Sequence, residues 1–228
     1  LTLARQRDVS WIVLEEIEAT DDIKAENGWL ATRFHDYRNM GLLRLSLWRT
    51  DTAPTVTMEG IESDACVGYV ILKRDSVPSR SMDAWHIYEA VLRKFPHPHN
   101  YCHAVAPFRF KVGAGDWAVP GCLYAQQNGL SKACAQVALR SILATRLSQA
   151  DVSYVDINGF ASEVAPLATP GEGLTTPQIS HVLKRFGVSH VAIDYGATPD
   201  LKRILPFEKL VYSGIESGSG ALMVFGME

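Results

Sequence analysis

The segment LYAQQNGLSKACAQVALRSIL, residues 123 to 143, places a cysteine beside residues that could support its reactivity. Cys134 falls in the first turn of a predicted helix that starts at Ser131 or Lys132 and ends near Leu147. Apolar residues recur along this helix at the spacing of a single helical face. That face consists of Ala135, Ala138, Leu139, Ile142 and Leu143. The pattern predicts a helix headed by a cysteine and preceded by a polar, glutamine-rich loop.

A cysteine at the start of a helix can act as a nucleophile. The unpaired backbone N–H groups and the helix dipole stabilise a thiolate, which lowers the thiol pKa from its free value of about 8.5. A thiolate attacks carbonyl carbons, and the oxyanion that forms needs hydrogen-bond donors. The backbone N–H of Cys134 is one donor, and the side-chain amide of Gln127 or Gln126, seven and eight positions upstream, could be another. The competing interpretation of Cys134 is a small residue buried in a core helix.

A second group of chemically capable residues lies in PHPHNYCH, residues 96 to 103. It contains His97, His99, Cys102 and His103, all of types that bind metals. Zinc requires three or four such ligands around one centre, and no second ligand pair of familiar spacing accompanies this group. We therefore predict a loop that enters a strand, with no metal and no cofactor. A metal-binding protein is kept as an alternative.

Composition limits the class of protein. The 228 residues are 47% hydrophobic and 21% charged, with a formal net charge of -3, which argues against a nucleic-acid binder that uses a basic face. No apolar run approaches the roughly 20 residues that span a bilayer. The cysteines at 66, 102, 122 and 134 form no CxxC pair, and we expect free thiols. These features predict a soluble, cytoplasmic protein without a membrane span.

The N-terminal half is predicted to be rich in strands, with one early helix. Its strands are indicated by alternating or continuous apolar residues, and its helix by the capping type of Asp21 and Asp22. The predicted strands cover residues 11–18, 42–48, 66–72 and 101–115, the helix runs to Tyr37, and loops cover 49–65 and 73–82. We place the boundary of this half near Gly121, where the pattern changes.

The C-terminal half alternates helices and strands. The clearest helix follows GLTTPQ, with Thr176 as the predicted N-cap, Pro177 in the first turn and Gly187 as the stop. Further elements are predicted from apolar runs, prolines and glycines. They are a strand over 188–195, short helices over 198–205 and 206–218, and a last strand over 221–227.

Three segments in this order, QQNGLSKACAQVALRSIL, GLTTPQISHVLKRFG and YSGIESGSGALMVFG, resemble the papain-like cysteine peptidases. The bacterial branch that includes the double-glycine leader peptidases of bacteriocin exporters looks closest. The resemblance covers roughly residues 121 to 228 and implies an α+β fold with a Cys-headed helix packed on an antiparallel sheet. It implies a β-rich region over 1–120 and a catalytic domain over 121–228 that is incomplete at its C-terminal end.

The same resemblance implies roles for individual residues. Cys134 would be the nucleophile and Gln127 the oxyanion-hole glutamine, with Asn128 or Gln126 as substitutes because the interval in papain is one residue shorter. The family's catalytic histidine follows the last matched segment, so we expect it beyond residue 228. His181 and His190, the histidines downstream of Cys134, are expected to be structural.

The sequence therefore predicts a thiol-dependent hydrolase that cleaves a peptide or isopeptide bond, or an acyltransferase of the same architecture. Its partner would be a peptide or protein substrate. The alternative from another class is a papain-like module that has lost catalysis and binds a peptide or a protein partner.

Overall fold

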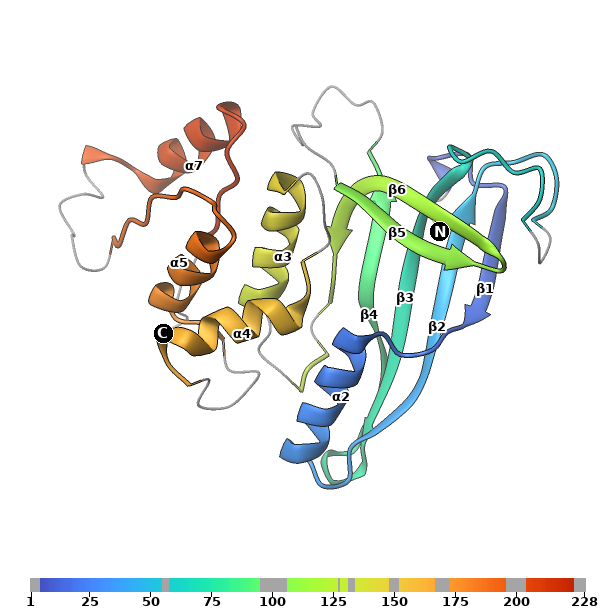
Figure 1. Ribbon diagram of the computed structural model, residues 1–228, viewed down its shortest axis with the longest axis horizontal. Coiled ribbons are helices and arrows are strands. Elements are labelled where there is room, and N and C mark those ends of the chain that lie inside the picture. The colour runs from blue at the N-terminus through green and yellow to red at the C-terminus, as the bar shows by residue number, and fades with distance from the viewer. Residues whose placement is uncertain are drawn as a thin grey trace.

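The computed structural model describes residues 5–54, 58–94, 106–126, 128–130, 134–147, 152–166, 173–195 and 204–223. Within these ranges the protein is an α+β structure, with a curled antiparallel sheet on one side and a group of helices on the other (Figure 1). The sheet has six strands in the order β1-β2-β3-β4-β6-β5. No helix in the described ranges combines the length and the apolar composition needed to cross a membrane.

The sheet is built from long neighbouring strands. Its members are β1 (Trp11–Glu16), β2 (Arg38–Trp48), β3 (Cys66–Val77), β4 (Met82–Arg93), β5 (Ala106–Val112) and β6 (Gly115–Tyr124). Every neighbouring pair is antiparallel. All of these strands precede Cys134 in the chain.

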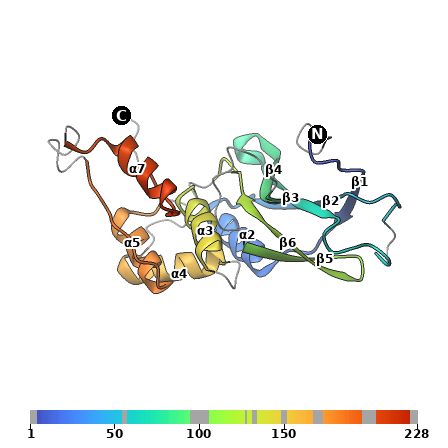
Figure 2. The ribbon, with the colours of Figure 1, turned by 90° about the horizontal axis from the view of Figure 1, so that it is seen from above.

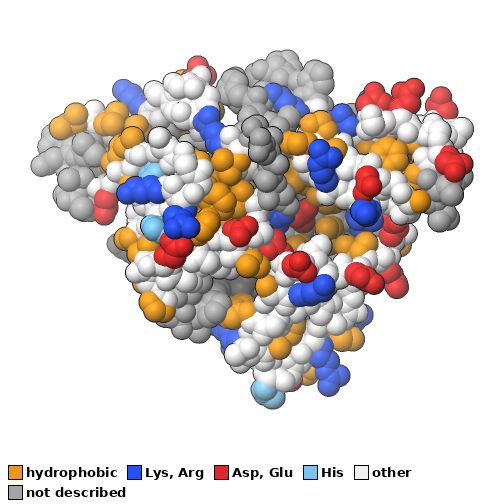
Figure 3. Space-filling model, viewed as in Figure 1, with side chains coloured by type: hydrophobic (Ala, Val, Ile, Leu, Met, Phe, Trp, Pro, Cys, Tyr) orange, Lys and Arg blue, Asp and Glu red, His pale blue; other side chains and the backbone are white. Residues whose placement is uncertain are grey.

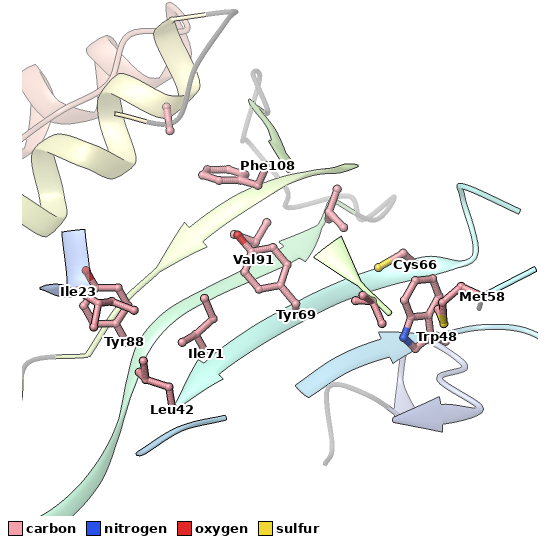
Figure 4. Packing of buried hydrophobic residues seen from close by; sticks show 13 residues of the cluster. Ile23, Leu42, Trp48, Met58, Cys66, Tyr69, Ile71, Tyr88, Val91 and Phe108 are labelled. Carbon is pink, nitrogen blue, oxygen red and sulfur yellow. The ribbon is translucent and has the colours of Figure 1, made fainter. Parts of the chain in front are cut away.

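The curl of the sheet brings strands together that are not neighbours in its order. Trp48 of β2 and Trp117 of β6 meet edge to face, with ring centroids 4.7 Å apart. At the turn after β5, the Gly113 N–H donates to Oε1 of Glu15 on β1, 3.1 Å away. The inner face therefore encloses a hydrophobic core, with Trp48, Met58 and Cys66 at one end and Ile23 and Tyr88 at the other (Figure 4).

The helices are α2 (Asp21–Arg33), α3 (Cys134–Arg146), α4 (Tyr154–Val164), α5 (Thr176–Arg185) and α7 (Phe207–Glu216). Helix α2 packs beside the sheet, whereas α3 stands between the sheet and the remaining helices (Figures 1 and 2). Ala144 of α3 joins the core of the sheet. Leu139 and Leu143 of the same helix join a second core with α4 and α5. Helix α3 is therefore shared by both cores.

Several predicted elements are confirmed with small shifts in their ends. Strands β1, β2 and β3 and helices α2, α3, α5 and α7 fall where the sequence predicts them. The N-cap of α5 is Thr175 rather than Thr176, and its hydroxyl accepts from the Gln178 N–H in a capping box. Gly187 has a φ of 71°, a left-handed conformation that favours glycine and ends the helix.

Other predictions are wrong. Residues 73–77 continue β3 instead of forming a loop, and β4, β6 and α4 were not predicted. Residues 188–195 form no strand, and neither do 221–223, the described part of the predicted last strand.

The boundary near Gly121 stays a prediction; Gly121 itself lies inside β6, where it pairs with Arg93 of β4. The predicted helix start at 131 or 132 lies outside the described residues.

Candidate active site

Cys134 is the first residue described in α3 and its side chain is exposed. The two other described cysteines differ: Cys66 is buried in the sheet core and Cys122 is half-buried. Burial raises the pKa of the Cys66 thiol to about 11. Of the described cysteines, Cys134 is thus the most exposed to solvent. Cys102 lies outside the described residues.

The surface of α3 around this cysteine is largely apolar. Val137, Ala138 and Ile142 are half-buried, and hydrophobic side chains gather over α3 in the space-filling view (Figure 3). The opposite side of the helix is closed, because Leu139 and Leu143 are fully buried. The half-buried side chains of Val137, Ala138 and Ile142 form an apolar strip beside this closed side, and its Ile142 end lies against Gly220.

The loop before α3 is held at Gln126 by strand β4. The Gln126 N–H donates to the Ile87 carbonyl at 2.8 Å, and the Ile87 N–H donates to Oε1 of Gln126 at 3.3 Å. The side chain of Gln126 therefore extends the strand pairing of β4. Gln127, the predicted oxyanion-hole residue, lies outside the described residues.

Asn128 is held on the other side of the loop by helix α2. Its Nδ2 donates to Oε1 of Glu26 at 3.0 Å, and its Oδ1 accepts from the Leu130 N–H at 2.9 Å. Asn128 and Leu130 are both buried, with 8% and 6% of their surfaces exposed. Of the two substitutes considered for the oxyanion hole, Gln126 is therefore bound to β4 and Asn128 to α2.

A buried charged cluster, which the sequence did not predict, lies beneath this loop. Nζ of Lys73 is 2.5 Å from Oε2 of Glu26 and 3.2 Å from Oδ1 of Asp75. The side chains of Lys73 and Asp75 have no exposed surface. The Tyr37 hydroxyl donates to Asp75 at 2.8 Å, and Nδ1 of His86 faces Oδ2 of Asp75 at 3.7 Å.

Burial raises the pKa of Glu26 and Tyr37 and lowers the pKa of His86. Desolvation raises the pKa of Glu26, and Lys73 opposes this shift, while Asp75 and Asp22 add to it. Desolvation also lowers the pKa of His86, with Asp75 opposing the shift and Lys73 adding to it. Desolvation and Asp75 raise the pKa of Tyr37. The cluster therefore resists both ionisation of Glu26 and protonation of His86.

One local signal could have revealed the cluster. Lys73 and Asp75 alternate with Arg74, so in a strand their side chains point to the same face. The polar residues, serines and proline of the segment 73–82 favour a loop instead, and charged residues are rarely buried unless they are paired. Their partner Glu26 is 47 residues from Lys73 in the chain, and no local pattern indicates that pairing.

The two histidines after Cys134 have other partners. Nε2 of His181 lies 2.8 Å from the carboxylate of Glu163. Nε2 of His190 lies 2.6 Å from Oγ of Ser180, and its Nδ1 lies 3.3 Å from the Val188 carbonyl. Because a carbonyl only accepts, Nδ1 is the donor in the contact with Val188. The contacts of His190 therefore tie the segment after α5 to that helix, and the contact of His181 joins α5 to α4. The structural role of both histidines stays a prediction.

The predicted metal-binding group, residues 97 to 103, lies outside the described residues. Within the described ranges no three metal-ligating side chains converge on one centre. Comparison with known proteins gave no matching family model, no matching curated protein and no matching solved structure.

Proposed function

We propose that the protein is a thiol-dependent hydrolase of the papain-like type, with Cys134 as its nucleophile. The observation that carries this proposal is the exposure of Cys134 at the start of α3, on a helix whose other side is buried in two cores. Unpaired N–H groups in the first turn of such a helix favour a thiolate. The order of the three sequence segments that resemble papain-like peptidases supports the same assignment.

In the proposed reaction, the Cys134 thiolate adds to the carbonyl carbon of a peptide or isopeptide bond. The oxyanion is held by N–H groups at the start of α3, with Gln127 as the proposed side-chain donor. Collapse of the intermediate releases the amine, which takes up a proton, and leaves a thioester on Cys134. Water then adds to the thioester and regenerates the thiol; an amine acceptor would give acyl transfer instead. The proton-transferring histidine of this scheme is assigned to none of the described residues.

The apolar strip formed by Val137, Ala138 and Ile142 suits a peptide substrate that lies along α3. A non-catalytic peptide-binding module is the second candidate. One observation favours it: the side chains of Gln126 and Asn128 are engaged with β4 and α2. In this alternative the same apolar strip holds a peptide without cleaving it.

The distinguishing experiment is the rate of iodoacetamide alkylation of each cysteine between pH 5 and 10, followed by peptide mass spectrometry. Cys66 is an internal control, because its buried thiol has a pKa raised to about 11. The C134S variant identifies the fast site. The hydrolase predicts that Cys134 alone reacts rapidly well below the free thiol pKa of about 8.5.

An ordinary profile at Cys134, with its midpoint at or above about 8.5, would overturn the hydrolase and leave the binding module. The same outcome follows if native Cys134 is inert and reacts only after unfolding. Rapid alkylation at low pH would support the hydrolase and justify a search among peptide substrates.

A further inference from the structure

Glu26 connects the segment before α3 to the charged cluster beneath it. Its two carboxylate oxygens have separate partners: Oε2 accepts from Nζ of Lys73, and Oε1 accepts from Nδ2 of Asn128. The side chain of Glu26 is 23% exposed, whereas that of Lys73 is fully buried. Glu26 therefore accepts one hydrogen bond from the buried ammonium group of Lys73 and another from the side-chain amide of Asn128.

Asn128 connects Glu26 to the backbone of the loop through two hydrogen bonds. Its amide is used at both ends, since Nδ2 donates to Glu26 and Oδ1 accepts from the N–H of Leu130. Leu130 is buried in a third apolar cluster with Leu30 of α2 and Val77 of β3. Asn128 is thus fixed to α2 by a polar contact, and Leu130 is fixed to α2 and β3 by apolar contacts. Both residues precede Cys134 by only a few positions.

The second restraint on the loop comes from the other side. Gln126 exchanges two hydrogen bonds with Ile87 of β4. Gln126 and Asn128 are therefore tied to different elements of the fold, β4 and α2. This arrangement fixes two described residues that precede the helix carrying Cys134.

We propose that Glu26 is a positioning residue for Cys134, which acts through Asn128 to hold the segment 128–130 in place. This inference rests on the proposed function, because its catalytic meaning depends on an activated Cys134. Lys73 keeps the Glu26 carboxylate oriented, and Asp75 completes the ion pairing of Lys73 on its other side. Glu26 itself does not touch the substrate.

The hydrogen bond from Asn128 to Glu26 can be tested by exchanging its donor and its acceptor between the two side chains. Glu26→Gln keeps an oxygen for Lys73 but then turns an NH2 group toward the NH2 group of Asn128. Asn128→Asp places a second carboxylate beside Glu26. Each single change therefore breaks the link. The double variant E26Q/N128D restores a hydrogen bond with the roles reversed, and the carboxylate of Asp at position 128 still accepts from the Leu130 N–H.

The readout is hydrogen–deuterium exchange of the peptide that contains Leu130, measured on the whole chain by mass spectrometry. A hydrogen bond to a charged group predicts about 10- to 100-fold faster exchange in E26Q and in N128D, with recovery to within about threefold of wild type in the double variant. Lys24→Ala is the matched control on the same helix, because Lys24 is exposed and pairs only weakly with Asp21. K24A should exchange like wild type.

Several outcomes would overturn the proposal: unchanged exchange in both single variants, or additive losses in the double variant. If E26Q does not fold, N128D alone provides the test, because it keeps an acceptor for the Leu130 N–H, removes the donor to Glu26 and leaves the Lys73 ion pairs in place. Exchange at Leu130 as slow as in wild type in N128D would also contradict the proposal.

Alkylation of Cys134 in the same variants separates this proposal from the proposed function. The positioning role predicts that E26Q and N128D shift the pH profile of Cys134 alkylation and that the double variant restores it. If wild-type Cys134 shows no activation, the hydrolase fails and the positioning role for Cys134 fails with it, even where exchange at Leu130 recovers in the double variant. If Cys134 is activated in wild type but equally so in E26Q and N128D, the hydrolase stands and only the positioning role is overturned.

Discussion

Arg140 of α3 and Glu89 of β4 form a buried ion pair, with Nη2 and Oε2 2.8 Å apart and side chains only 3% and 8% exposed. Two tyrosines complete the arrangement. The hydroxyl of Tyr69 donates to the other oxygen of Glu89, and the guanidinium of Arg140 lies over the ring of Tyr154 at 4.7 Å. This pair joins the sheet to the helices, since its two members come from different sides of the molecule.

Removal of one partner of this pair should be costly, because the other charge remains buried. We expect Arg140→Met or Glu89→Leu to lower the free energy of unfolding by about 3–5 kcal/mol, and R140M/E89L to cost less than either single variant. Arg74 and Asp83 provide the control, because their two hydrogen bonds of 2.7 and 2.8 Å are exposed. Arg74→Ala should change the free energy of unfolding far less than either of these variants, because solvent screens an exposed ion pair.

Urea denaturation followed by circular dichroism measures these differences. Equal losses in R140M and R74A would contradict the view that burial makes the first pair important. An additive double variant would show that Arg140 and Glu89 do not interact in solution.

The stability of the protein should fall in mild acid because of His86. Desolvation holds the pKa of His86 below its ordinary value of 6.5, so the unfolded chain binds this proton more tightly than the folded chain. The contribution of His86 to stability is therefore complete above pH 6.5 and is lost as the pH falls through the folded pKa. Denaturant midpoints measured from pH 8 to pH 5 should show a decline that is smaller in His86→Gln.

The control for this prediction is His35→Gln, because His35 is exposed at the end of α2. That variant should keep the decline of wild type. Equal declines in H86Q and wild type would show that other groups, such as Glu26 or Asp75, cause the sensitivity to acid.

Two glycines should respond in opposite ways to alanine. A Cβ atom on Gly121 of β6 would lie 2.4 Å from the carbonyl oxygen of Leu92, so Gly121→Ala must push β6 away from β4. We expect a loss of about 1–3 kcal/mol. A Cβ on Gly159 in α4 meets nothing within 4 Å, and Gly159→Ala should stabilise the protein by about 0.5–1 kcal/mol. Thermal unfolding of the two variants tests both signs.

Asp22 ties the start of α2 to the start of α4. Its carboxylate accepts from the N–H groups of Tyr154 and Val155, each at 3.3 Å. Asp22→Ala should cost about 1 kcal/mol, the usual effect of losing an N-terminal capping group. Asp21→Ala is the matched control, because Asp21 is fully exposed in the same turn of α2. Equal losses in the two variants, measured by urea denaturation, would mean that the contact with α4 contributes nothing.

Sequence patterns predicted those elements whose signals are local. The N-cap of α5 was predicted one residue late, at Thr176 instead of Thr175, and Gly187 ends the helix through its own backbone conformation, as predicted. Likewise, the position of Cys134 at the start of an amphipathic helix follows from the spacing of its neighbours. These features depend on residues a few positions apart, so the sequence alone determined them.

The tertiary structure decided which charged residues are buried. Residues 73–82 were predicted as a loop, whereas Lys73 and Asp75 lie in β3, where Lys73 pairs with Glu26 and Asp75 accepts from Tyr37. Strand β4, which the sequence did not predict, likewise carries His86 and Glu89 into the interior. A buried charge is stable only beside its partner, and only the folded chain brings the two together.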